Sequence, residues 1–308
     1  MHPGIALLIY LVSVFLGGAL GAPWLYRGIQ VAAGLVPALQ PLAAHLFSRY
    51  VGRALLLAAL VGLWPLLRSV GLRSWQEMGL SQPARQWRRL AAGVVIGSGM
   101  LAALFLLELM GAARDFNANR TLGDLGLRLL RAAQTAGLVS VIEELLFRGT
   151  LFGVLRKNWS WPTALGLSSG VYAFLHFLGH PPEPPMVNWL SGLTALFAML
   201  ATAAAALLTP GFLNLALLGM ILGVSYQRTG SLFFSIGLHA GWIFGLKLGG
   251  FLTRAVADTR GAFWGSGRVI DDWLAFLVLG LLLAFCLRFP WPGPRTDGTP
   301  WQRHLQTN

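Results

Sequence analysis

The chain has 308 residues, of which 56% are hydrophobic and only 11% are charged, and its formal net charge is +12. This composition, with a mean hydropathy of +0.64, is typical of a polytopic membrane protein and excludes an ordinary soluble domain. The Arg residues gather in short segments between apolar runs, which favours positive-inside topology and attraction to anionic headgroups over nucleic-acid binding. The single cysteine, Cys286, excludes a disulfide framework and a cysteine-based metal site.

The N-terminal part predicts two spans and one segment of undecided type. The apolar run from Gly4 to Ala22 has no Lys or Arg ahead of it, so we expect a retained first span rather than a cleaved signal peptide. The next apolar segment, Ile29 to Phe47, contains prolines, Gln40 and His45, which fits either a poor span or a re-entrant or interfacial segment. A short span follows, and the basic segment from Arg68 to Leu90 predicts a cytoplasmic loop or surface helix.

Further apolar runs follow along the rest of the chain, without the alternation of β-strands. The basic cluster at Arg156 and Lys157 places the C-terminal end of the run from Ala132 to Leu155 on the cytoplasmic side. We therefore expect an all-α fold, a polytopic transmembrane bundle of eight spans, or nine if the segment from Ile29 crosses. The expected location is a cell membrane, the inner membrane of a bacterium.

Three charged side chains lie in the middle of the apolar run from Ala132 to Leu155: Glu143, Glu144 and Arg148. A charge at bilayer depth costs about 2.5 to 3.5 kcal/mol on insertion scales, so three close together indicate a functional site. On a helix, Glu144 and Arg148 form an i,i+4 pair with the acid on the N-terminal side, which is the more favourable orientation. Glu143 points about 100° away round the helix and has no such partner within this run. This pattern is typical of a general base beside its structural support.

His176 and His239 are the other ionisable side chains expected deep inside spans. At a rise of about 1.5 Å per residue, Glu143 and the two His lie roughly 20 to 25 Å from one end of their spans. If those ends face the same side, which requires two spans between Trp189 and Tyr226, the three side chains share one layer. A carboxylate and two imidazoles at one depth can activate water, or can hold a metal ion with an open position. Lys247, near a span end, is expected to snorkel toward water.

Small residues recur at a spacing of four, most extensively at Gly241, Gly245 and Gly249. Such spacing lets helix backbones approach closely in lipid, so we predict that this ridge is a packing surface. The chain has no Gly-x-Ser-x-Gly nucleophile motif, and Ser140 and Ser235 are expected to bond to backbone carbonyls of their own helices.

The polar residues of these spans occur as three ordered motifs: Glu143-Glu144-x-x-x-Arg148, then Tyr172-x-x-x-His176, then Tyr226-Gln-Arg-Thr-Gly-Ser231 leading into Gly237-Leu-His239-Ala-Gly-Trp242. Together they resemble the motifs of the CPBP family of intramembrane endopeptidases, which includes CAAX prenyl endopeptidases and bacteriocin-processing relatives. The resemblance covers roughly Gly137 to Leu248. The first motif alone is weak evidence for this family. Its occurrence before the two His motifs, each in a separate span, is specific to the family.

The resemblance implies a glutamic-type endopeptidase that acts on a membrane protein or a lipidated peptide, with membrane lipids as further partners and no nucleic acid. By this resemblance Glu143 is the general base, His176 assists it and His239 stabilises the oxyanion. The supporting residues are Glu144, Arg148 and Tyr172. No cofactor is expected. Zinc bound by Glu143, His176 and His239 is the alternative, because the same residues were earlier interpreted as a metal site.

Ile243 departs from the third motif, which usually has Asn or Asp four residues after its His. An Asn there would share the oxyanion with His239, and losing one such donor costs about 2.7 to 4 kcal/mol in the transition state. Ser235 and Asn214 are candidate substitutes. Two other functions therefore stay open: a non-catalytic scaffold that binds a membrane peptide, which Ile243 supports, and a proton-coupled transporter, for which buried Glu and His are also typical.

The motifs divide the chain into three expected regions. Residues 1–131 hold N-terminal spans and the basic cytoplasmic segment, residues 132–252 form a catalytic helical core, and residues 253–308 form the last span and a polar tail.

Overall fold

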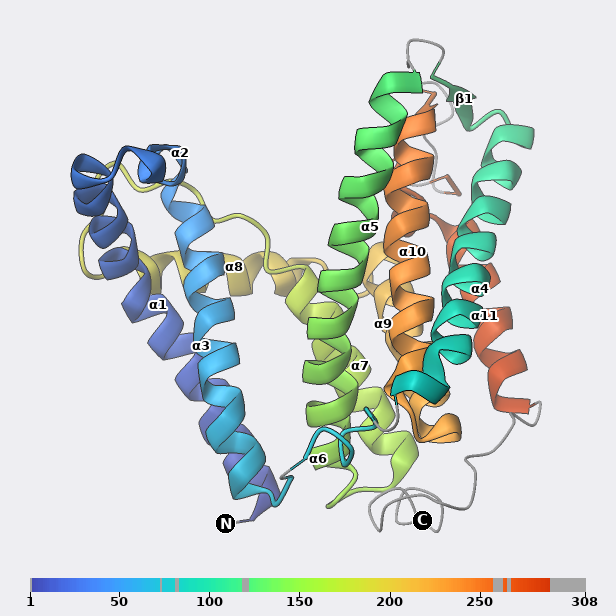
Figure 1. The fold of residues 1–308 in the computed structure, drawn as a ribbon, viewed down its shortest axis with the longest axis horizontal. Helices are drawn as coiled ribbons and strands as arrows, with labels where there is room; N and C mark the ends of the chain where they lie inside the picture. Colours follow the sequence, from blue (N-terminus) through green and yellow to red (C-terminus); the bar gives the residue numbers. More distant parts are fainter. Residues whose placement is uncertain are drawn as a thin grey trace. The chain divides into compact units, whose positions relative to one another are not determined.

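The computed structural model describes residues 2–72, 74–80, 83–117, 122–256, 263–264 and 267–288. These residues are almost entirely helical, and a single two-stranded antiparallel sheet pairs β1 (Arg114–Phe116) with β2 (Thr253–Ala255) (Figure 1). Five helices are long and apolar enough to cross a membrane. They are α1 (Pro3–Leu35), α3 (Phe47–Ser69), α4 (Pro83–Met110), α9 (Pro210–Thr229) and α10 (Leu232–Leu252). The all-α membrane bundle is thus confirmed, whereas eight or nine spans stay a prediction.

The chain divides into two compact units. The first unit comprises residues 1–73 and 174–207, and the second comprises residues 74–173 and 208–308. Helix α7 (Trp161–His176) runs from the second unit into the first, so that His176 belongs to the first unit. The three regions expected from the sequence were defined by motifs, whereas the two units are defined by contacts between residues. The three regions therefore stay a prediction.

In the first unit, α1 continues well past the predicted end of the first span at Ala22. Pro23 lies inside it, and the helix ends only at Leu35, because Pro37 forces Val36 into an extended conformation. Two short turns, η1 (Pro37–Leu39) and α2 (Gln40–Ala43), then lead to α3. The segment from Ile29 is therefore not a separate span. Helix α8 (Ser191–Ala205) packs against α1 and, less extensively, α3.

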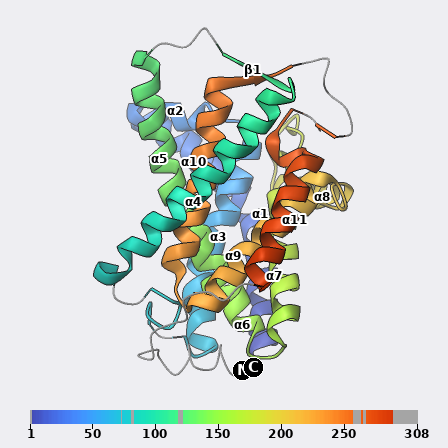
Figure 2. The ribbon, with the colours of Figure 1, turned by 90° about the vertical axis from the view of Figure 1, so that its right-hand side faces the viewer.

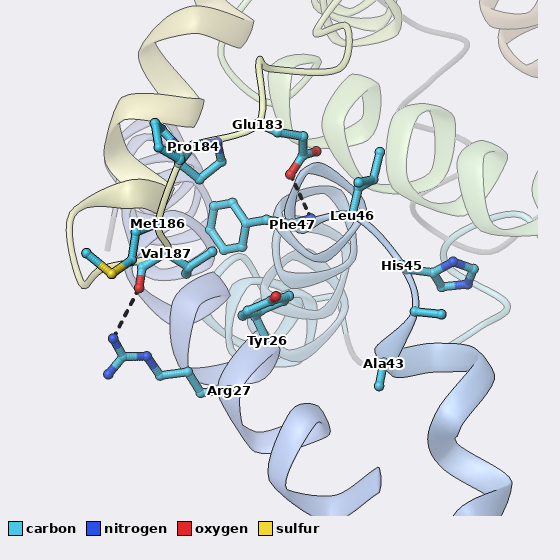
Figure 3. Close-up of a pocket in the computed structure, with 12 residues that line it drawn as sticks. Tyr26, Arg27, Ala43, His45, Leu46, Phe47, Glu183, Pro184, Met186 and Val187 are labelled. Atoms are coloured by element: carbon cyan, nitrogen blue, oxygen red, sulfur yellow. Dashed lines mark hydrogen bonds between the residues drawn. The ribbon is translucent and has the colours of Figure 1, made fainter.

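The N-terminus of α3 is capped by a residue from a distant part of the chain (Figure 3). The residue in the capping position, Leu46, has no side-chain acceptor. Instead, the Glu183 carboxylate accepts the backbone N–H groups of Phe47 and Ser48 at 2.9 and 3.0 Å. Its negative charge also faces the positive end of the helix dipole. Glu183 thus fastens the loop after α7 to α3, beside a pocket of about 620 Å³.

In the second unit, α10 is the central helix and packs against α4, α5 (Leu122–Glu144) and α9. Figure 2 shows α4 running diagonally across α10. The β1–β2 pair joins the segment after α4 to the segment after α10, and α11 (Trp273–Arg288) packs against α9. Other helices of the second unit therefore pack against α10 on several sides.

Glycines make the closest approach between α4 and α10. A Cβ atom added at Gly241 would lie 2.5 Å from the Val94 carbonyl oxygen, and one added at Gly245 would lie 2.7 Å from the Leu101 Cβ atom. A Cβ atom at Gly249 would overlap the Phe105 ring. The predicted glycine ridge is therefore confirmed as a packing surface, and its partner is α4.

Replacing Gly241 by Ala should destabilise the protein, because a methyl group would have to push the backbone of α4 away. Overpacking of this kind costs typically about 1 to 3 kcal/mol. Gly250→Ala is the matched control, since a Cβ atom there meets no other atom within 4 Å. Thermal unfolding in detergent should show a lower midpoint for Gly241→Ala and an unchanged or slightly higher one for the control. Equal midpoints for the two variants would contradict this packing.

A buried carboxyl pair lies between the end of α4 and the start of α11. Glu108 and Asp272 are each 2% exposed, and they share a side-chain hydrogen bond. Arg114 lies beside the pair, with Nε 3.5 Å from Glu108 Oε2. Burial, the hydrogen bond and charge of Glu108 and the charge of Asp271 together raise the pKa of Asp272 to about 9, although Arg114 opposes the shift. At neutral pH Asp272 therefore keeps its proton.

This pair predicts a specific pH dependence of stability. Folded Asp272 keeps its proton up to about pH 9, whereas the unfolded chain loses it near the ordinary value of 3.8, so its contribution is full at low pH and is lost as the pH rises between those values. Asp272→Asn, which stays neutral, should lessen the fall in unfolding midpoint between about pH 6 and pH 9. The control is Asp115→Asn, on the exposed side of β1. A wild-type fall that persists in Asp272→Asn would refute this assignment.

Candidate active site

The acidic motif lies where regular α-helix gives way to a wider turn. Helix α5 ends at Glu144, and a π-helical segment, η2 (Leu145–Phe152), continues into the short α6 (Gly153–Leu155). Segments of π-helix are rare and are frequent at functional sites, since the changed winding redirects side chains. The predicted acidic span is therefore continuous but changes its winding directly after the two Glu residues.

Glu144 is fully buried, and its Oε1 atom contacts nitrogen atoms from two parts of the fold. Arg148 Nη1 donates to it at 2.9 Å, which is the i,i+4 pair that the spacing predicts. His239 Nδ1, from α10, lies 3.0 Å from the same oxygen. Arg148 Nη2 also donates to the carbonyl oxygen of Gly219 on α9, at 3.1 Å. Glu144 and Arg148 therefore connect η2, α9 and α10.

His239 bridges the two neighbouring carboxylates. Because Nδ1 faces the Glu144 carboxylate, an acceptor, this nitrogen carries a proton, and Nε2 is left to face Glu143. The distance from Nε2 to Glu143 Oε2 is 3.8 Å. The side chain of Glu143 keeps 22% of its surface exposed, against none for Glu144. Of the two acids, Glu143 has the more accessible side chain.

Tyr172 closes the cluster from α7. Its hydroxyl group hydrogen-bonds to Glu143 and lies 3.5 Å from His239 Nε2. The guanidinium carbon of Arg148 lies 4.6 Å from the centre of its ring, a cation–π contact. The Tyr172 hydroxyl is thus in contact with the acid and the imidazole.

The structure places His239 beside Glu143. His176 is the last residue of α7, is exposed, and belongs to the first unit. Its predicted role beside Glu143 therefore stays a prediction. Between Trp189 and Tyr226 the structure has α8 and α9; α9 is long and apolar enough to cross a membrane, whereas α8 is shorter, so the shared layer stays a prediction.

The two expected substitutes for the missing Asn are engaged elsewhere. Ser235 donates to the Leu232 carbonyl, the backbone bond that was predicted for it. Asn214 donates through Nδ2 to the backbone carbonyls of Ile270 and Asp272, near the start of α11. Neither side chain is a free donor at the cluster, so both suggestions were wrong.

Trp242 is a donor that the sequence interpretation overlooked, although it lies within the third motif. Its side chain is buried, and its Nε1 atom has no hydrogen-bond partner among the residues that the structure describes. On α10 it follows His239 by three residues, so the two side chains share one side of the helix. An indole N–H in an apolar span is a polar group that normally needs an acceptor, and this was the available signal.

The described residues contain no group of three His, Cys, Asp or Glu side chains with the arrangement of a metal site. Zinc bound by Glu143, His176 and His239 stays an alternative prediction, and no step is derived through a metal ion.

The residues of this cluster lie within a stretch of the chain that matches a known protein family. Residues 126–245 match the family model described as Type II CAAX prenyl endopeptidase Rce1-like. No curated protein and no solved structure matches the chain. The match contains all three motifs, from Glu143 to Trp242. Residues 126–245 are therefore similar to the type II CAAX prenyl endopeptidases, which supports the resemblance of the three motifs to the CPBP family.

Proposed function

We propose that the chain is a glutamic-type intramembrane endopeptidase in which Glu143 activates the water that cleaves a peptide bond. The observation that supports this most is the shared imidazole: His239 lies 3.0 Å from buried Glu144 and 3.8 Å from the more accessible Glu143. The two neighbouring acids thereby acquire different environments. Such separation is how one site obtains a structural carboxylate and a working one.

In the proposed reaction Glu143 accepts a proton from water, and the resulting hydroxide attacks the substrate carbonyl carbon. The carbonyl oxygen becomes an oxyanion, which Tyr172 stabilises through its hydroxyl and His239 through Nε2–H, with the imidazole protonated on both nitrogens. When the C–N bond breaks, Glu143 returns its proton to the leaving amine, so that one water is consumed. His176 assists Glu143, as the family resemblance implies. Arg148 pairs with the buried Glu144, and the Glu144 carboxylate orients the imidazole.

Trp242 is the donor that we assign in place of the missing Asn. Ile243 cannot donate a hydrogen bond, whereas the buried indole N–H one residue earlier has no acceptor among the described residues. A developing oxyanion would supply that acceptor only during the reaction, and this is the condition under which binding energy accelerates the chemical step.

The substrate is proposed to be a membrane protein or lipidated peptide. The family description names CAAX prenyl endopeptidases, whose substrates carry a lipid on a cysteine near the C-terminus. A span number of eight and residence in a bacterial inner membrane belong to the same proposal. A non-catalytic scaffold remains the second candidate because of Ile243, and turnover that depends on both His176 and His239 would exclude it.

Glu143→Gln should abolish cleavage while leaving the protein folded, since Gln keeps the size of the side chain but cannot accept the proton. The measurement is mass spectrometry of both fragments of membrane-anchored probe peptides in proteoliposomes, with one farnesylated peptide ending in Cys-a-a-X and one unmodified transmembrane peptide. Loss of a general base typically lowers the rate by about 10²- to 10⁴-fold.

Glu77→Gln is the control, because it makes the same chemical change in the second unit outside the cluster. Its turnover should equal that of the wild type. Cleavage by Glu143→Gln at the wild-type rate would refute the proposed base. The same assay in a chelator tests the zinc alternative, which would gain support from inhibition that added Zn²⁺ reverses.

Trp242→Phe should lower kcat by about 10²- to 10³-fold with little change in KM, because the indole N–H is proposed to act only on the oxyanion. Phe retains the aromatic packing of the buried side chain. Trp264→Phe, outside the motif region, is the control and should leave kcat unchanged. An unaltered kcat in Trp242→Phe would remove this residue from the mechanism.

A further inference from the structure

Three cationic side chains line a second pocket, between α5 and α10. Arg128 and Arg131 come from α5 and Lys247 from α10, around a cavity of about 320 Å³. Thr135 and the apolar side chains of both helices complete its wall, and the guanidinium carbon of Arg128 lies 5.4 Å from the centre of the Phe251 ring. The pocket therefore combines a concentrated positive charge with an apolar surface.

Within the described residues, no carboxylate lies within ion-pair distance of Arg131 or Lys247, and both side chains are exposed. Like charges that share a small pocket repel one another, and the repulsion is strongest where water is partly excluded. An anion in the pocket would remove this repulsion. This charge arrangement thus points to an anionic ligand.

Positive-inside topology does not account for these cations. The start of α5 and the end of α10 lie together at the end of the second unit that carries β1, and α6 lies at the other end (Figures 1 and 2). Arg131 precedes the basic cluster at Arg156 by 25 residues, or roughly 37 Å of helix. If Arg156 is cytoplasmic, the pocket faces the opposite leaflet, where an excess of Lys and Arg is not expected.

The depth of the pocket matches a lipid headgroup. Lys247 precedes the end of α10 at Leu252 by five residues, or about 7.5 Å, which is the interfacial region of a span. Thr135 lies eight residues before Glu143, or about 12 Å along the helix, so the pocket is separate from the catalytic cluster. Basic pockets between transmembrane helices are a recognised way to bind acidic headgroups.

We propose that this pocket binds the phosphate group of an anionic phospholipid, with the lipid chains lying along the apolar groove between α5 and α10. Arg131 and Lys247 contact the phosphate oxygens, and Arg128, held against Phe251, contributes at the rim. The bound lipid joins α5 to α10, the two helices that carry Glu143 and His239. The binding itself does not depend on the proposed endopeptidase activity.

The test uses the full chain in neutral detergent, titrated with short-chain phosphatidylglycerol, with phosphatidylcholine of equal chain length, and with inorganic phosphate. The unfolding midpoint and the number of bound lipids in native mass spectrometry are the two measurements. Phosphatidylglycerol should raise the midpoint and remain bound as one tight molecule. Replacing Arg131 and Lys247 together by Gln should weaken this binding about 30-fold, because each interfacial cation contributes about fivefold.

Arg88→Gln with Arg89→Gln, on α4, removes the same charge elsewhere and should leave the tight lipid bound. Arg131→Lys keeps the charge and should retain most of the affinity even if the double variant folds poorly. Equal binding of phosphatidylcholine, an equal midpoint shift with inorganic phosphate alone, or an equal loss in the α4 control would each overturn the proposal, since each would show that a lipid phosphate at this pocket is not recognised.

Discussion

The second unit depends on one buried oxygen atom, Oε1 of Glu144. Nitrogen atoms of Arg148 and His239 both lie about 3 Å from it. Arg148 also donates a hydrogen bond to a backbone carbonyl of α9. A carboxylate without these partners would be an uncompensated charge in an apolar bundle, at a cost of about 3 to 5 kcal/mol. The same contacts that make the charge tolerable also fix the orientation of the imidazole. Stability and the geometry of the site are therefore set by one interaction.

Close packing of the helix backbones fixes the position of His239 relative to Glu144. His239 lies on α10 between glycines that allow α4 to approach its backbone, so α10 has little freedom to slide or rotate. On the other side, the π-helical turn after Glu144 sets where Arg148 points. Tyr172 adds a third helix that contacts Glu143 and Arg148 at once. The accessible acid, Glu143, is thus placed at the edge of a rigid polar cluster.

Helical spacing rules predicted the contacts that depend on residues close together in the sequence. The Glu144–Arg148 pair follows from their i,i+4 spacing, and the α10 ridge follows from glycines four residues apart. The contact of His239 with Glu144 joins residues 95 positions apart, and no local pattern specifies which carboxylate an imidazole will meet. The π-helical turn and the proton kept by Asp272 also depend on tertiary packing. For this reason the sequence interpretation of Asn214 and Ser235 as donors was wrong, and Trp242 was overlooked.

The central claim is that Glu143 activates a water molecule that attacks the substrate directly. It is tested most directly by a single turnover of a farnesylated Cys-a-a-X peptide, with enzyme in excess, in ¹⁸O-labelled water. The account predicts one ¹⁸O atom in the new carboxylate of the product and none in the protein. A product without ¹⁸O, together with label in the Glu143 carboxylate, would show that Glu143 is instead the nucleophile and would contradict the account.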